Sequence, residues 1–170
     1  MINPIVKLIA IDNFYSREEA QRLCGITYNL QYQQSEFGTE ISNFNMVAPD
    51  FGDQLASLLN TQIEVDEEKS GVFRIPDQFI HFEPFDALRD WLFVVALQES
   101  VFNIYEHETG TQTALEEYKY NYRNLFEWKL ITSHILQPGH GVLFRPWLFH
   151  SFDSGQIQIF RLREKDANVL

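Results

Sequence analysis

Residues 141–163 read GVLFRPWLFHSFDSGQIQIFRLR and contain three short segments that are typical of β-strands. Gly141–Phe144 is apolar, Pro146 marks a turn, Leu148–Phe152 follows, and Gln156–Arg163 alternates polar with apolar residues. Gly, Pro, Asp and Ser occupy the gaps between the segments, as tight turns require. The stretch therefore predicts consecutive strands of a β-rich domain.

Strand-like segments continue upstream as far as residue 71. They are Gly71–Arg74, Gln78–Glu83, Trp91–Leu97, Val101–Glu106 and Trp128–Leu136. The apolar run Trp91–Leu97 is interpreted as a strand because it is short and contains two valines, while a buried helix is the alternative. The long gap His107–Glu127 fits an extra edge strand, a short helix or a lid. Eight strands in this order indicate a two-sheet jelly roll or barrel.

The first part of the chain, about residues 1–65, predicts a helical leader. Val6–Ile11 is mostly apolar and is typical of a strand. Ser16 with Glu19 three residues later forms a capping-box pattern at the start of a helix. A second helix is predicted from Asp50 to near Asn60. Because no repeat or linker interrupts the 170 residues, we expect one domain, mainly β with N-terminal helices.

Composition limits the partners and the compartment. The formal net charge of −11 argues against binding nucleic acid through phosphate contacts and against binding an anionic membrane. The single cysteine, Cys24, cannot form an internal disulfide, which is typical of a reducing compartment. The longest apolar run, Trp91–Leu97, is too short to span a bilayer. We therefore expect a cytoplasmic protein.

Two histidines and one carboxylate form a candidate metal site. His81 and Glu83 lie two residues apart in a predicted strand, so their side chains share one face. If that face is buried, the charge must be paired or metal-bound; if it is exposed, the two residues are a solvated pair. His150 adds a second imidazole from a later strand. This ligand set is found in non-heme Fe(II) sites that keep coordination positions open.

Arg161 is a candidate anion-binding residue. It shares a face of the predicted strand Gln156–Arg163 with Ile157 and Ile159, which places it among the inward-facing apolar residues. An arginine in that position requires a buried anion, and its planar fork matches a carboxylate. The alternatives are an internal salt bridge or a side chain that reaches back to solvent.

These elements occur in the order that one oxygenase family uses. They are the pair His81-x-Glu83, the strand and turn Gly141–Pro146, His150 and Arg161. From about Val6 to Arg163 the chain resembles the 2-oxoglutarate- and Fe(II)-dependent oxygenases, and its opening is similar to that of the prolyl-hydroxylase-like branch. The resemblance implies a double-stranded β-helix, the jelly-roll barrel that cupins also have.

The resemblance also implies the cofactors and the roles of the residues. His81, Glu83 and His150 would ligate Fe(II), and Arg161 would bind the distal carboxylate of the co-substrate 2-oxoglutarate. The expected activity is that of a dioxygenase, in particular a hydroxylase, which oxidises a small molecule or a peptide residue and releases succinate and CO₂.

A second residue often completes the carboxylate site in this family. Tyr105 is the candidate here, with Asn103 on the same face of the predicted strand Val101–Glu106.

Glu83 departs from the family pattern, which usually has aspartate at that position. Glutamate extends the carboxylate by about one carbon–carbon bond, ~1.5 Å. A catalytically inactive jelly-roll binding protein is therefore one alternative. A cupin-like metal enzyme is another, although Phe82–Glu83 interrupts the His-x-His pattern of cupins and Arg161 has no role there. The sequence specifies neither the substrate nor an oligomeric state.

Overall fold

The computed structural model describes residues 8–34, 40–42, 50–74, 89–108 and 124–165. Within these segments the chain forms ten strands, two α-helices and a short 3₁₀ helix. The elements are β1 (Leu8–Ile11), α1 (Arg17–Thr27), β2 (Gln33–Gln34), β3 (Glu40–Ser42), α2 (Phe51–Leu59), β4 (Ile63–Arg74), β5 (Asp90–Ala96), β6 (Ser100–His107), η1 (Leu125–Glu127), β7 (Trp128–Leu136), β8 (Gly141–Phe144), β9 (His150–Asp153) and β10 (Gln156–Glu164).

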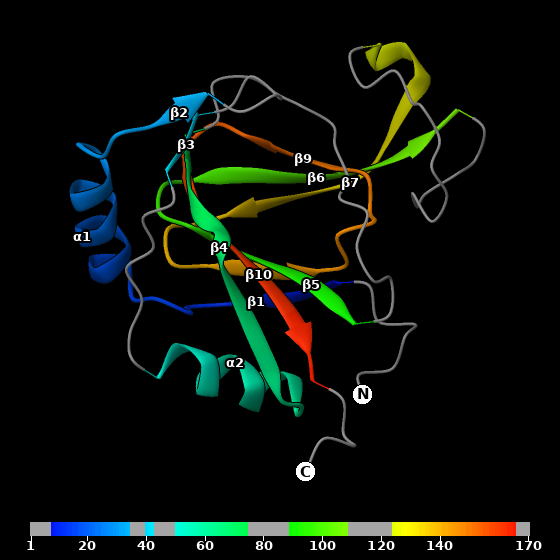
Figure 1. The fold of residues 1–170 in the computed structure, drawn as a ribbon. Helices are drawn as coiled ribbons and strands as arrows, with labels where there is room; N and C mark the ends of the chain where they lie inside the picture. The colour runs from blue at the N-terminus through cyan, green and yellow to red at the C-terminus, as the bar shows by residue number, and fades with distance from the viewer. Residues whose placement is uncertain (1–7, 35–39, 43–49, 75–88, 109–123, 166–170) are drawn as a thin grey trace.

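The strands of the described segments form two antiparallel sheets (Figure 1). The larger sheet has the order β1-β8-β5-β10-β4-β3-β2, and the smaller one has the order β7-β6-β9. Apolar side chains from both sheets form one core between them, including Val94 and Ile157 from the larger sheet and Phe102 from the smaller. This arrangement agrees with the predicted β-rich, two-sheet class.

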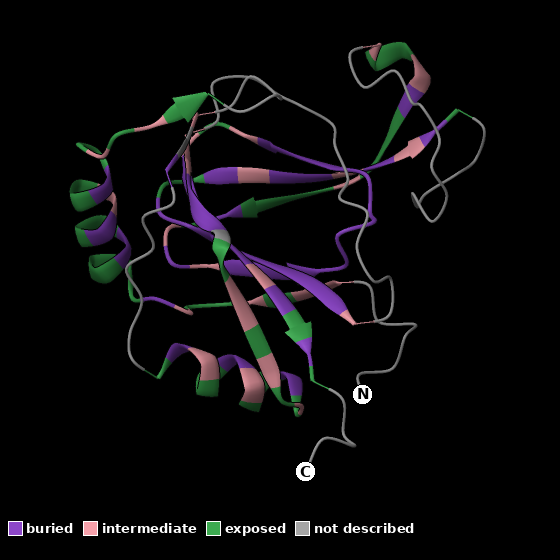
Figure 2. Ribbon diagram, viewed as in Figure 1, coloured by how far each residue is buried: buried purple, intermediate pink, exposed green. Residues whose placement is uncertain are grey.

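The two helices pack on the other face of the larger sheet. Leu23 of α1 and Leu55 of α2 belong to a second core with Phe93 and Phe160, which project from the central strands. In Figure 2 the exposed residues of both helices lie on the sides turned away from this core. Strand β5 is buried along its whole length because it has a core on each face, and its continuous apolar run follows from that position.

Both helix predictions are confirmed. The Ser16 side chain accepts a hydrogen bond of 3.1 Å from the backbone N–H of Glu19, as the capping-box pattern predicts. The second helix begins after Asp50 and ends at Asn60, which adopts a left-handed conformation. Neither α1 nor α2, nor any other helix in the described segments, is long and apolar enough to cross a membrane.

Replacing Ser16 with alanine is expected to destabilise the protein by about 1 kcal/mol, because the first turn of α1 loses its side-chain acceptor. The measurement is chemical unfolding at equilibrium. Ser57→Ala is the matched control, since Ser57 is an exposed residue in the interior of α2 and alanine is at least as favourable there. Equal effects of the two changes would contradict a capping role for Ser16.

Several strand boundaries differ from the prediction. Strand β4 begins at Ile63, eight residues before the predicted start at Gly71, and β2 and β3 were not predicted. The charged residues within β4 obscured its first half, and β2 is a pair of glutamines. The predicted strand Gln78–Glu83 and most of the gap His107–Glu127 lie outside the described residues.

A two-residue turn carries the chain from the smaller sheet to the larger. Ser154 and Gly155 connect β9 to β10, and both have positive φ, 54° and 76°. Two consecutive left-handed residues reverse the chain within a very short length, and glycine adopts this conformation without steric cost. The strands that carry His150 and Arg161 are therefore joined by the shortest kind of connection.

Candidate active site between the two sheets

His150 lies at the start of β9 and faces the core between the sheets. Its side chain is buried, with 1% of the residue exposed. The imidazole contacts Phe144 edge-on, with ring centroids 4.7 Å apart, and lies near Phe102 and Phe152. All three phenylalanines belong to the inter-sheet core. The imidazole is thus held by aromatic rings in a largely dry environment.

A backbone carbonyl fixes the orientation of this imidazole. Nδ1 of His150 lies 2.7 Å from the carbonyl oxygen of Leu148, so Nδ1 carries the proton and donates it. In a neutral imidazole the lone pair then resides on Nε2. Metal-ligating histidines are oriented in this way, with one ring nitrogen donating to a carbonyl and the other available as the ligand atom.

Arg161 belongs to a row of residues that crosses the larger sheet. The strand registers place Phe144 opposite Leu92, Leu92 opposite Arg161, and Arg161 opposite Asp66. Directly opposed residues project from the same face of a sheet. Because Leu92 and Phe144 line the inter-sheet core, Arg161 faces the interior as well. Phe144 also contacts the His150 ring, so the imidazole and the guanidinium face one interior region from opposite sheets.

Arg161 lines a cavity of about 480 Å³. Burial lowers the pKa of Arg161 to about 10, and the Asp66 carboxylate acts in the opposite direction. The guanidinium therefore remains charged at neutral pH. A charged, partly dehydrated guanidinium in a cavity of this size can bind a carboxylate in a two-point arrangement.

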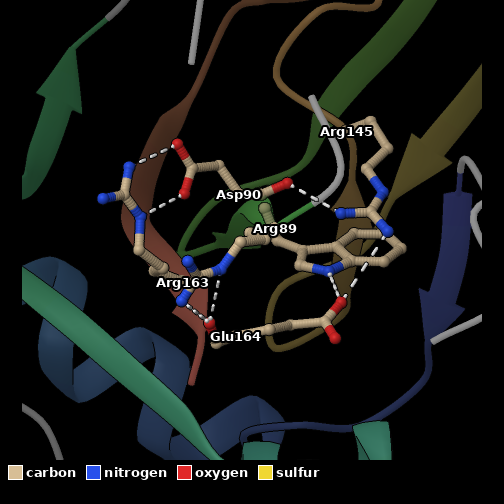
Figure 3. Close-up of polar contacts among 6 residues, drawn as sticks. Arg89, Asp90, Arg145, Arg163 and Glu164 are labelled. Carbon is tan, nitrogen blue, oxygen red and sulfur yellow. Dashed lines mark hydrogen bonds and ion pairs between the residues drawn. The ribbon is translucent and has the colours of Figure 1, made fainter. Parts of the chain in front are cut away.

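Acidic residues form much of the remaining cavity wall, and one further arginine accompanies them. Arg163 makes a two-point ion pair with Asp90, with Nε to Oδ1 at 2.7 Å and Nη2 to Oδ2 at 2.9 Å (Figure 3). The carboxylates that line the cavity are Glu64, Asp66, Glu67, Glu68 and Asp90. Anions that enter this cavity therefore meet more negative than positive groups.

A third arginine, Arg145, is fully buried and lies beside the cavity wall. The guanidinium of Arg145 lies 3.6 Å from the centre of the Trp91 ring, and its Nη2 is 3.7 Å from Oε1 of Glu164 (Figure 3). The Trp91 indole donates a 2.7 Å hydrogen bond to the same glutamate oxygen. Nη1 of Arg145 also donates to the backbone carbonyl of Asp90. This cluster joins β5, β10 and the connection between β8 and β9 at the end of the larger sheet next to the cavity.

Comparison with solved structures gives consistent matches over nearly the whole chain. SnoK, a non-heme alpha-ketoglutarate-dependent carbocyclase from nogalamycin biosynthesis, matches with a TM-score of 0.63 at 9% identity, covering 94% of this chain and 81% of SnoK. HygX from Streptomyces hygroscopicus, with nickel and 2-oxoglutarate bound, matches with a TM-score of 0.59 at 10% identity, covering 94% of this chain and 83% of HygX. The viral collagen prolyl hydroxylase of Paramecium Bursaria Chlorella virus-1, in its 2-oxoglutarate complex, matches with a TM-score of 0.55 at 15% identity. The match covers 95% of this chain and 98% of the hydroxylase.

This chain has the fold of the 2-oxoglutarate-dependent oxygenases. The structural matches confirm at the level of the fold the resemblance that the motif order indicated. No family model matches the sequence, and no curated protein matches it.

Two of the three predicted metal ligands of this oxygenase fold, His81 and Glu83, lie outside the described residues. Within the segments that are described, no group of three or more His, Cys, Asp or Glu side chains could hold a metal ion. The ligand set therefore stays a prediction, to which the structure adds the position and orientation of His150.

Tyr105 and Asn103, the residues predicted to complete the carboxylate site, form contacts on the other face of the smaller sheet. The amide of Asn103 donates to Oγ of Ser151 at 3.4 Å and to Oδ2 of Asp153 at 3.1 Å. The Tyr105 hydroxyl is 3.0 Å from the same serine. Ser151 is the neighbour of His150 in β9, and neighbouring strand residues point to opposite faces. Both residues thus lie on the face of the smaller sheet that is turned away from Arg161.

The alternation within β6 explains the direction of these two side chains. Phe102 and Ile104 pack into the inter-sheet core, so the residues between and after them face the other way. Asp66 was missed for a related reason, because the first half of β4 was not predicted to be a strand. The alternating sequence Ile63–Glu64–Val65–Asp66 contained that signal.

Proposed function

We propose that this chain is a non-heme iron oxygenase that uses 2-oxoglutarate as co-substrate. His81, Glu83 and His150 would hold Fe(II), and Arg161 would bind the distal carboxylate of the keto acid. The observation that supports the proposal most is that His150 and Arg161 face the same interior region. A buried imidazole that presents Nε2 and a half-buried guanidinium face the same interior from opposite sheets.

The donor chemistry of these residues fits the metal and the co-substrate. Two neutral imidazoles and one carboxylate suit Fe(II), and three protein ligands leave room for other groups at the metal. When bound, the metal and the keto acid supply oxygen activation coupled to the release of succinate and CO₂. The proposal requires His81 and Glu83 to lie within ligand distance of His150.

The chain's own residues would orient the reactants and exclude water. The hydrogen bond from His150 to the carbonyl of Leu148 fixes the ring plane, and the surrounding aromatic rings keep solvent from the imidazole. Arg161 would hold the far end of the keto acid and so set the position of its reactive end.

The proposed substrate is a small molecule or a residue within a peptide, oxidised most simply by hydroxylation. This range rests on the structural neighbours, which include HygX with hygromycin B bound and a viral collagen prolyl hydroxylase. The proposed location is the cytoplasm, and the proposed architecture is the closed double-stranded β-helix of that fold.

Anaerobic addition of Fe(II) and 2-oxoglutarate tests the proposal directly. We expect the weak visible charge-transfer band that a keto acid gives when it chelates Fe(II), and succinate formation after oxygen is admitted. Absence of the band at saturating concentrations would argue for a non-catalytic jelly roll. A metal-dependent reaction that needs no keto acid would favour a cupin-like enzyme.

Replacing Arg161 with alanine is expected to weaken 2-oxoglutarate binding by about 100-fold, because a buried two-point contact to a carboxylate is lost. Metal affinity should change by less than about threefold, since Arg161 is not a proposed ligand. Calorimetric titration of each component measures both quantities. Arg163→Gln is the control, because Arg163 lies on the same face of β10 but is more exposed and pairs with Asp90. Equal losses of metal and keto acid in Arg161→Ala would contradict the role given to this residue.

A further inference from the structure

A carboxylate of the chain itself faces the proposed anion-binding arginine. Asp66 of β4 is the register partner of Arg161 in β10, and both residues line the same cavity. Directly opposed residues of neighbouring antiparallel strands project side by side from one face of the sheet, so the two charged groups are neighbours. The guanidinium thus has an acidic neighbour within the protein.

An irregular segment of β4 fixes this neighbour in place. The register passes from Gly71 opposite Ile159 directly to Asp66 opposite Arg161, so that residues 67–70 stand opposite Phe160 alone. Ser70 holds the irregularity together, since its hydroxyl donates to the backbone carbonyl of Asp66 at 2.6 Å and accepts from the backbone N–H of Arg161 at 3.1 Å. Ser70 is buried, with 1% exposed. Without this bulge a different residue of β4 would face Arg161.

We propose that Asp66 is an internal counterion of Arg161 that limits the affinity of the cavity for 2-oxoglutarate by competing with its distal carboxylate. This inference rests on the proposed function. Asp66 compensates the guanidinium charge when the cavity holds no diacid. An incoming carboxylate must then share the guanidinium with a like charge nearby, and in a partly dry cavity that repulsion is screened only weakly.

The inference makes Asp66 a positioning and specificity-determining residue. Its repulsion acts on the end of the ligand that contacts Arg161, so a keto acid without a distal carboxylate should not experience it to the same extent. Asparagine at this position keeps the shape and an oxygen acceptor for the guanidinium but removes the charge. The charge effect can therefore be separated from the packing effect.

The test is calorimetric titration of 2-oxoglutarate into the Mn(II)-loaded protein, with pyruvate as the ligand that lacks the distal carboxylate. Asp66→Asn is expected to tighten 2-oxoglutarate binding by about tenfold, within the range usual for coupled charged sites. Pyruvate binding should change by less than about twofold. Glu64→Gln is the matched control, since it removes one negative charge from the same cavity wall at the position opposite Arg163, and it should leave both ligands within about twofold of wild type.

A double-mutant cycle identifies the residue through which Asp66 acts. In an Arg161→Gln background, Asp66→Asn should no longer change the affinity for 2-oxoglutarate. If Asp66→Asn does not fold, Asp66→Ser carries the same test because it also removes the charge.

The outcomes separate this inference from the proposed function. The inference is supported if Asp66→Asn binds 2-oxoglutarate more tightly than wild type and Glu64→Gln does not. It is also supported if Asp66→Asn binds 2-oxoglutarate and wild type does not bind it measurably. If wild type binds 2-oxoglutarate and Asp66→Asn binds it no more tightly, the inference alone is overturned. The same holds if Glu64→Gln tightens binding as much as Asp66→Asn does. No binding of 2-oxoglutarate by any of the three proteins overturns the proposed function, and the inference with it.

Discussion

His150→Ala is expected to abolish the visible band with Fe(II) and 2-oxoglutarate and to weaken metal binding by more than about 100-fold. Loss of groups that merely orient a ligand already weakens metal binding by about 10–100-fold, so loss of the ligand itself should exceed that range. Metal affinity is measured by titration with Mn(II) or Fe(II) under anaerobic conditions, and succinate formation is followed in parallel.

The control for this variant is His134→Ala. His134 also projects from the interior side of the smaller sheet, since it is the register partner of Phe102, but it is exposed on the edge strand β7. We expect it to retain the band and the metal affinity of wild type. Because His150 is buried, circular dichroism must show that His150→Ala is folded. A folded His150→Ala protein with an undiminished band would eliminate His150 as a ligand.

Arg145→Gln is expected to destabilise the protein by about 3–5 kcal/mol, because it leaves the carboxylate of Glu164 buried without its cation. The side chains of Arg145 and Glu164 are 1% and 4% exposed, so water cannot replace the lost partner. The change also removes the contact between the guanidinium and the Trp91 ring. Equilibrium unfolding in denaturant measures the effect.

An exposed ion pair provides the comparison for this variant. Arg22 and Glu19 lie 3.4 Å apart on α1, with side chains that are 56% and 45% exposed. Arg22→Gln should therefore change stability by no more than about 0.5 kcal/mol. If Arg145→Gln were equally mild, the buried cluster would not support this end of the larger sheet.

The sequence predicted the elements whose pattern is local. The apolar run of β5, the alternation of β10 and the cap of α1 each follow from residues within the element itself, and each was identified. The first half of β4 was not, because it carries charges on a face that lines a cavity instead of an apolar core. Charged residues in a strand are explained by their partners across the sheet, which the sequence does not display.

The candidate site could be predicted only in part, because some of its features are local in sequence and others depend on contacts across the sheets. The motif order selected His150 and Arg161, and the strand pattern placed Arg161 with the inward apolar residues. Three features depend on how the strands and turns are arranged in space: the hydrogen bond from His150 to the carbonyl of Leu148, the opposition of Asp66 and Arg161, and the direction of Tyr105. Register between distant strands is determined by bulges and by the pairing of whole faces, which one sequence does not specify.

The turn at Ser154 and Gly155 also limits how far apart along the chain His150 and Arg161 can be. Only Ser154 and Gly155 lie between the end of β9 and the start of β10, so the chain from His150 to Arg161 takes a nearly direct path between the two sheets. One residue inserted within β10 before Arg161, with the start of the strand kept in register, would exchange the faces beyond it and turn Arg161 toward the helices. The interval of the chain from His150 to Arg161 is consequently the part least free to vary in length, whereas segments elsewhere can lengthen without altering that spacing.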